Sequence, residues 1–91
     1  MRTVRLHIAG KVQGVGYRAW AMRIAADLGL RGWVRNRANG TVELLITGGD
    51  DPVAVMTEAC RHGPAGARVD SIDKFEAEDD GSLGFSAKET A

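Results

Sequence analysis

The sequence predicts an α+β fold, a ferredoxin-like split β-α-β sandwich with two helices on one face of an antiparallel sheet. Three observations lead there. Segments with the two-residue period of strands alternate with segments of helical period in the order β-α-β-β-α-β. The pair Asn39-Gly40 marks a hairpin between the central strands. That element order is typical of split β-α-β sandwiches, and the last residues leave room for a short extra C-terminal strand.

The first unit is a strand, a glycine-bearing loop and a helix. Val4, Leu6 and Ile8 alternate with polar or small residues, as in a half-buried strand. Gly29 suits the left-handed conformation that closes a helix. Between loop and Gly29, apolar residues recur at helical spacing and predict an inner helix face. Its members are Tyr17, Ala21, Ile24, Ala25 and Leu28.

A hairpin follows. Residues 31–37 and 41–47 are expected to pair antiparallel around Asn39-Gly40, because both turn residues tolerate positive φ. Apolar and polar residues alternate along the second of these strands, which predicts one buried face and one partly polar face. The buried face consists of Val42, Leu44 and Ile46.

The second helix has clear boundary signals. Asp51 is expected to cap it, Pro52 to lie in its first turn and Gly63 to end it. Its expected inner face carries Val53, Met56 and Cys60.

The last segment has the weakest pattern. Val69 and Ile72 are three residues apart, which breaks the alternation of a strand and predicts either a β-bulge or a later start of the strand. Phe75 and Ala77 are expected to continue one face, and residues 78–82 indicate a turn. A short last strand is expected at Leu83, Phe85 and Ala87.

Length and composition limit what the chain can be. With 91 residues, 44% hydrophobic and 26% charged, it is expected to form one globular domain over residues 1–91. Twelve basic residues balance twelve acidic ones, so no general positive field attracts nucleic acid or a membrane. A single cysteine excludes an internal disulfide and a Cys-based zinc site. The first residues resemble neither a signal peptide nor a membrane span, so a cytoplasmic location is expected. A monomer is expected as well.

The candidate anion site is the loop between the first strand and the first helix. Gly14 and Gly16 allow several backbone N–H groups to face one point, where the positive end of the helix dipole reinforces them. Arg18 adds a planar fork of donors that suits two phosphate oxygens. On the loop alone, a tight turn with a solvated Arg18 is an equally good interpretation.

Two common phosphate motifs are excluded. A Walker A loop ends in Gly-Lys-Ser/Thr, whereas Gly16 is followed by Tyr17 and Arg18. Residues 14–19 match Gly-x-Gly-x-x-Ala, but the acidic residue that a dinucleotide site needs about 20 residues later is absent.

Two longer segments carry a family resemblance. "GKVQGVGYR" (residues 10–18) and "GWVRNRANGTVE" (residues 32–43) resemble, in the same order, the two signatures of the acylphosphatase family. The looser "GPAGARVD" (residues 63–70) extends the similarity over nearly the whole chain.

The resemblance implies an acylphosphatase, an enzyme that hydrolyses the carboxyl–phosphate bond of acetyl phosphate, carbamoyl phosphate or 1,3-bisphosphoglycerate without metal or cofactor. It implies that Arg18 grips the phosphate and that Asn36 orients the attacking water. It further implies a backbone phosphate cradle made by Gln13, Gly14, Val15, Gly16, Tyr17 and Arg18.

The chemistry fits this residue set. The leaving carboxylate has a conjugate-acid pKa of roughly 4 and departs without a general acid. Phosphoryl transfer depends mainly on positioning and charge stabilisation, so N–H donors, one arginine and one amide suffice. Asn36 is not basic enough to take the proton of the water, and our hypothesis is that a phosphate oxygen of the substrate receives it. The small residues of the loop predict broad acyl specificity.

Two other functions compete with this one. A non-catalytic module that binds phosphate or carbamoyl phosphate with a partner enzyme is the main alternative, since acylphosphatase-like domains occur within hydrogenase maturation proteins. Single-stranded RNA binding is disfavoured by the zero net charge and by the lack of paired aromatic residues on the central strands.

Other reactive residues have simpler interpretations. His7 is expected on the solvent side of its strand, and His62 is too distant in sequence to imply a metal pair. Cys60, Trp20 and Trp33 are expected to be packing residues. Arg35 and Arg37 either add positive potential at the site or lie on a solvated strand face. Asp79 and Asp80 belong most simply to a polar turn.

Overall fold

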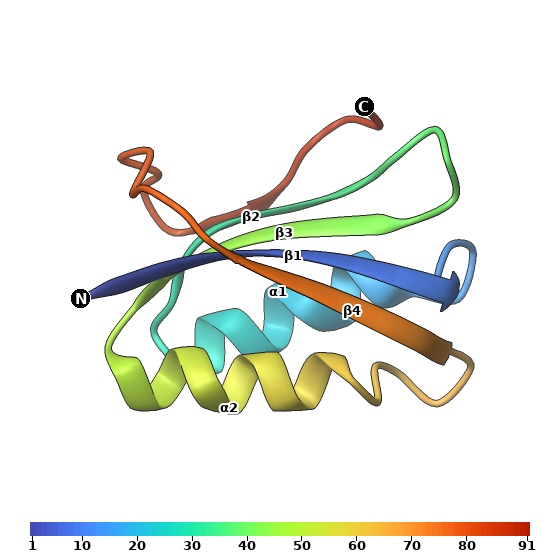
Figure 1. Ribbon diagram of the computed structural model, residues 1–91, viewed down its shortest axis with the longest axis horizontal. Coiled ribbons are helices and arrows are strands. Elements are labelled where there is room, and N and C mark those ends of the chain that lie inside the picture. Colours follow the sequence, from blue (N-terminus) through green and yellow to red (C-terminus); the bar gives the residue numbers. More distant parts are fainter.

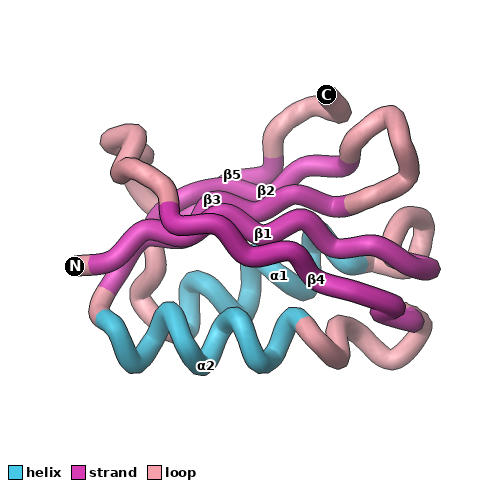
Figure 2. Tube along the Cα trace, viewed as in Figure 1, coloured by secondary structure: helices cyan, strands magenta, loops and turns pink.

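The structure, a computed structural model, describes residues 1–91 and confirms the predicted ferredoxin-like α+β fold. The strands form one sheet in the order β4-β1-β3-β2-β5. Figures 1 and 2 show that both helices lie on the same face of this sheet. The elements are β1 (Arg2–Lys11), α1 (Tyr17–Asp27), β2 (Arg31–Asn36), β3 (Val42–Gly48), α2 (Asp50–Cys60), β4 (Arg68–Glu76) and β5 (Phe85–Ala87).

The sheet is mixed rather than wholly antiparallel, which corrects the sequence-based prediction. Strands β1 to β4 pair antiparallel, but β5 pairs with β2 in parallel, with Gly32 opposite Phe85 and Val34 opposite Ala87. The chain reverses direction after β4 and crosses to the other edge of the sheet, so β5 runs opposite to β4, as β2 does. Leu83 is outside the last strand and is 94% exposed, so its predicted place there is wrong.

The core lies between the sheet and the two helices. The predicted inner faces supply Tyr17, Ala21 and Ala25 from α1, and Val53, Met56 and Cys60 from α2, all of which are buried. Strands β1, β2 and β3 supply most of the remaining core residues: Val4, Leu6, Ile8, Val34, Val42, Leu44 and Ile46. Cys60 is a packing residue, as expected.

Two local predictions have different outcomes. Of the two alternatives for the last segment, the β-bulge is confirmed, because β4 begins before Val69 and its pairing with β1 shifts register between Ala9 and Gly10. The predicted cap of α2 is wrong: Gly49 is the N-cap, and Asp50 and Asp51 lie in the first turn. There the carboxylates interact favourably with the positive end of the helix dipole, which gives Asp51 a stabilising position without a capping hydrogen bond.

The outer face of the sheet holds a cluster of charged residues around Glu43. The predicted partly polar face of β3 is buried, and the Glu43 side chain is only 6% exposed. Arg35 Nε donates to Glu43 Oε1 over 2.7 Å, and His7 Nε2 lies 3.1 Å from Oε2. Burial alone raises the pKa of the Glu43 carboxyl, but the hydrogen bonds from Arg35 and His7 outweigh it and hold the pKa below its usual 4.5.

The segment between β4 and β5 is tied to β2. Asp79 pairs with Arg31, and Asp80 Oδ2 accepts a hydrogen bond of 3.0 Å from Trp33 Nε1. Asp79 and Asp80 therefore do more than form a polar turn, because they hold the return segment against the strand that β5 joins. Trp33 is 5% exposed, in keeping with its expected packing role.

Tyr17 connects the beginning of α1 to the end of α2. Its hydroxyl donates to the Cys60 carbonyl over 2.7 Å, and no backbone N–H donates to that carbonyl. Burial, reinforced by the contact with Cys60, raises the pKa of the Tyr17 phenol well above its usual value of 10. Because Tyr17 directly follows the glycine loop, this hydrogen bond fixes where the loop meets the helix layer.

Replacing Tyr17 by phenylalanine is expected to lower the free energy of unfolding by about 1 to 3 kcal/mol, because the buried Cys60 carbonyl loses its partner. Urea unfolding of both proteins measures the change. An unchanged unfolding midpoint would contradict the proposed anchoring.

An alkaline titration gives an independent check, because Tyr17 is the only tyrosine. The raised pKa means that the fold favours the neutral phenol, so its contribution to stability is present below about pH 10 and is lost as the pH rises further. Tyrosinate absorbance is expected to appear together with unfolding. Ionisation in the intact fold near the ordinary tyrosine pKa would contradict this.

Candidate active site

The loop between β1 and α1 turns through two glycines in the left-handed region. Gly14 has φ 73° and Gly16 has φ 81°. No atom lies within 4 Å of a Cβ built on either residue, so it is the backbone conformation and not crowding that favours glycine. Gly16 is the N-cap of α1, and no side chain caps the helix. The first turn of α1 therefore presents its free N–H groups to this side of the loop.

Unpaired backbone donors are concentrated in this segment. No backbone N–H from Gln13 through Ala19 donates to a backbone carbonyl, and the first donor after them is Trp20 N, which bonds Gly16 O over 3.0 Å. The loop and the helix N-terminus thus combine a run of free donors with the positive end of a helix dipole. This combination is suited to an oxyanion such as phosphate.

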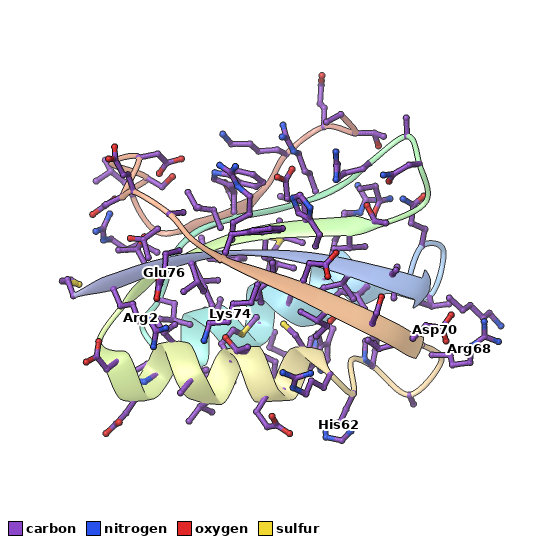
Figure 3. All side chains as sticks on the ribbon, viewed as in Figure 1. Arg2, His62, Arg68, Asp70, Lys74 and Glu76 are labelled. Carbon is purple, nitrogen blue, oxygen red and sulfur yellow. The ribbon has the colours of Figure 1, made fainter.

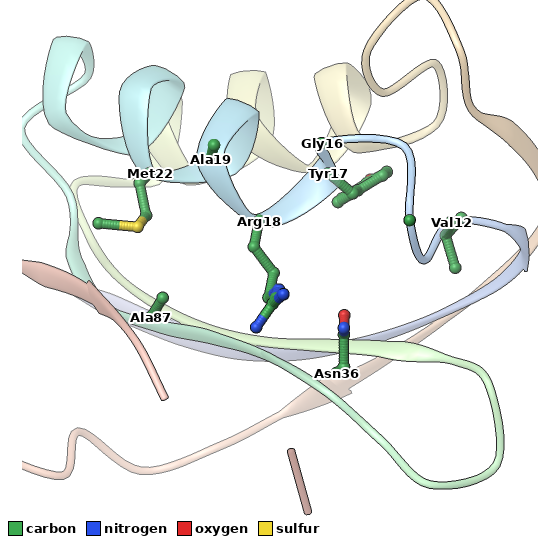
Figure 4. Close-up of a pocket in the computed structure, with 9 residues that line it drawn as sticks. Val12, Gly16, Tyr17, Arg18, Ala19, Met22, Asn36 and Ala87 are labelled. Atoms are coloured by element: carbon green, nitrogen blue, oxygen red, sulfur yellow. The ribbon is translucent and has the colours of Figure 1, made fainter. Parts of the chain in front are cut away.

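A cavity of about 310 Å³ opens beside these donors. Its lining residues include Gly14, Gly16, Arg18 and Asn36, so the two predicted catalytic side chains lie at one site. Figure 4 shows the Arg18 guanidinium reaching from α1 toward the Asn36 amide on the sheet. The arginines that pair with carboxylates are others, namely Arg2, Arg5, Arg31, Arg35, Arg61 and Arg68.

The strand geometry explains the position of Asn36. Side chains alternate between faces along β2, and Val34 is in the core beneath the helices. Asn36, two residues later, faces the same side at the end of the strand, next to the cavity. Its amide is half-buried and forms no side-chain hydrogen bond within the protein, so both its carbonyl and its NH₂ group are free to contact a ligand or water.

The side chains of three members of the predicted loop hold it in place, and of these three residues only Tyr17 also lines the cavity. The Gln13 side chain is bonded to the β2–β3 hairpin, donating to Arg37 O and Thr41 O. Val15 packs against the core, and the Tyr17 ring is buried. The backbone N–H groups of these three residues have no hydrogen-bond partner within the protein.

Sequence analysis missed part of the wall. Val12, Ala19, Met22 and Ala87 also line the cavity. Met22 is four residues after Arg18 on α1, so helical spacing alone could have placed it on the same face. Ala87 has no such signal, because it reaches the site only through the pairing of β5 with β2.

The remaining charged candidates lie elsewhere. Arg35 bonds Glu43, and Arg37 Nη1 lies 3.4 Å from His7 Nδ1, so both belong to the outer face and not to the site. Figure 3 shows His62 beyond the end of α2, pointing away from the sheet. The structure contains no group of three or more His, Cys, Asp or Glu residues that could hold a metal ion. None of its helices has the length and apolar character needed to cross a membrane.

Comparison of the sequence with known proteins gives a consistent result. The family described as Acylphosphatase matches residues 4–87. The acylphosphatase of Rhodospirillum rubrum is 50% identical over 88 residues, which are 97% of each chain. The acylphosphatase of Rhizorhabdus wittichii is 50% identical over 86 residues, covering 94% of this chain and 87% of the relative.

Solved structures agree with the sequence comparison. An acylphosphatase from Bacillus subtilis superposes with a TM-score of 0.93 at 34% identity, over 97% of this chain and 99% of the other. HypF of T. kodakarensis also matches, with a TM-score of 0.85 at 32% identity. That alignment covers 97% of this chain but only 12% of HypF.

Proposed function

This chain belongs to the acylphosphatase family, and on that premise we propose how its residues hydrolyse acyl phosphates. It is a hydrolase that acts on small acyl phosphates. Acetyl phosphate, carbamoyl phosphate and 1,3-bisphosphoglycerate are the proposed substrates, each split into a carboxylate and inorganic phosphate. The observation that carries the mechanism is the convergence of free N–H donors, Arg18 and Asn36 on one cavity.

Phosphate binding is the first proposed step. The backbone N–H groups of residues 13–18 surround the phosphoryl oxygens, and the Arg18 guanidinium contacts two of them through its planar fork. Because Arg18 has no carboxylate partner to displace, it can engage the phosphate without breaking an internal ion pair. The same donors stabilise charge on the transferring phosphoryl group in a loose transition state.

Asn36 orients the nucleophile in this mechanism. Its side-chain carbonyl accepts a hydrogen bond from water, which directs a lone pair of the water oxygen at phosphorus, opposite the leaving carboxylate. The P–O bond to the acyl group breaks as the new P–O bond forms. The proton of the water passes to a phosphate oxygen of the substrate. No general acid is needed, since the carboxylate leaves as an anion, and the proposal requires neither metal nor cofactor.

The wider setting of the enzyme is also part of the proposal. The single core shared by both helices and the sheet supports one domain over residues 1–91. The buried, unpaired Cys60 fits a reducing compartment, which supports a cytoplasmic location. We further propose that the enzyme is a monomer. Nucleic acid is not a proposed substrate, because basic and acidic residues balance.

A phosphate-binding module that acts with a partner enzyme is the second candidate. It is favoured by one observation, the match of this chain to about one eighth of HypF, where the same fold occurs inside a much longer chain. Such a module would bind phosphate through the same donors but would not turn over an acyl phosphate. Activity of the isolated chain separates the two functions.

Hydrolysis of benzoyl phosphate in the presence of a chelator tests the assigned roles. Asn36→Ala is expected to lower kcat by about 100-fold or more, because the water loses its orientation, while the inhibition constant of phosphate stays within about twofold. Arg18→Ala is expected to lower kcat and to raise both KM and the phosphate inhibition constant, because it removes contacts made in binding and in the transition state.

Arg23→Ala is the matched control, since Arg23 is an exposed arginine on the same helix and does not line the cavity. It is expected to keep the wild-type kcat and KM. Phosphate binding without hydrolysis by any protein would favour the binding module. Loss of activity on chelation would contradict the metal-free mechanism.

Broad acyl specificity is a separate expectation. Apart from Arg18 and Asn36, the wall is formed by glycines and by apolar residues such as Ala19, Met22 and Ala87, which offer an acyl group little polar recognition. The kcat/KM values for acetyl phosphate and benzoyl phosphate are expected to agree within about tenfold. A preference of more than about 100-fold for either would show that the cavity selects the acyl group.

A further inference from the structure

We propose that the Gln13 side chain is a positioning residue, which sets the distance between the phosphate cradle and Asn36. This inference rests on the proposed function. Gln13 Nε2 donates to Arg37 O and to Thr41 O, each over 2.9 Å. A primary amide has two N–H donors, and both are used here. Arg37 directly follows Asn36, and Thr41 is the residue opposite Arg37 in the β2–β3 hairpin, where Arg37 N bonds Thr41 O.

The topology makes this contact necessary. The cradle follows β1 and Asn36 ends β2, but β3 lies between these two strands in the sheet. The pairing of β1 with β3 ends at Ile8 and Val42, so the chain after that point has no ladder to the hairpin. Figure 1 shows the loop after β1 and the β2–β3 hairpin at the same end of the sheet. The only hydrogen bonds that join residues 12–16 to residues 36–42 are the two from Gln13.

The contact is suited to positioning more than to stability. Arg37 O also accepts a hydrogen bond from Gly40 N over 3.0 Å, and Thr41 O accepts one from Arg37 N over 2.9 Å. Loss of the Gln13 amide therefore leaves neither carbonyl without a partner. The cradle donors belong to the loop backbone and Arg18 to α1, so phosphate binding does not require the amide. What depends on it is the alignment of the water at Asn36 with a phosphorus atom in the cradle.

Two variants of similar side-chain length test the role. Gln13→Met removes the donors, and Gln13→Glu replaces them by a carboxylate that faces two carbonyls. With benzoyl phosphate as substrate, Gln13→Met is expected to lower kcat by about 10- to 100-fold, the loss associated with a misplacement of about 1 Å. The inhibition constant of inorganic phosphate is expected to stay within about twofold. Gln13→Glu is expected to lower kcat at least as much.

Thr57→Val is the matched control, because Thr57 Oγ1 also donates to a backbone carbonyl, that of Val53, over 2.8 Å in α2. It is expected to change the unfolding temperature without changing kcat. An unchanged kcat in Gln13→Met, with wild type active, would overturn the inference and leave the proposed function intact. A phosphate inhibition constant that rises in parallel with the loss of kcat would also overturn it, because Gln13 would then shape the cradle itself. An inactive wild type that binds phosphate would overturn the proposed function and this inference with it.

Discussion

A short stretch of backbone with no hydrogen-bond partners inside the protein is the feature on which the site depends. From Gln13 to Ala19 every N–H is left free, because Gly14 and Gly16 turn the chain through the left-handed region and α1 begins without a side-chain cap. Free donors cost little where the loop is exposed to water, and they become binding groups when an oxyanion replaces that water. The rest of the molecule holds this stretch still. Tyr17 fixes its far end to α2, and Gln13 fixes its near end to the hairpin.

The sheet order provides the second half of the site. Because β3 lies between β1 and β2 and is antiparallel to both, β1 and β2 run in the same direction. Their C-terminal ends are therefore at the same end of the sheet, and the loop after β1 lies near Asn36 at the end of β2. Arg18 and Asn36 both belong to the first half of the split fold, β1-α1-β2, and the two strands of that half are separated by β3 of the second half. The parallel addition of β5 closes the cavity with Ala87, and the contacts of Asp79 and Asp80 with β2 hold the segment that leads there.

Charged residues are separated between the two faces of the sheet. Glu43 contacts Arg5, His7 and Arg35 on the outer face of the sheet. The helix-side cavity is left with Arg18 as its single charged side chain. A site for an anionic substrate gains from this arrangement, since no carboxylate competes with phosphate for the arginine. In the proposed mechanism the leaving carboxylate needs no proton, which is consistent with a cavity lining that contains no His, Cys, Asp or Glu residue.

The sequence by itself determined the periodicity of most elements, the central hairpin, the glycine loop and both candidate catalytic residues. These are local properties: strand and helix periods, turn glycines and the two signature segments are all visible within a few residues of one another. Only the tertiary structure decided the parallel direction of β5, the burial of Glu43, the place of Ala87 in the cavity and the partners of the Gln13 amide. Each of these depends on which distant segments meet. A residue pattern fixes which face of an element is apolar, but not which edge of the sheet the returning chain joins or which carbonyl a side-chain amide finds there.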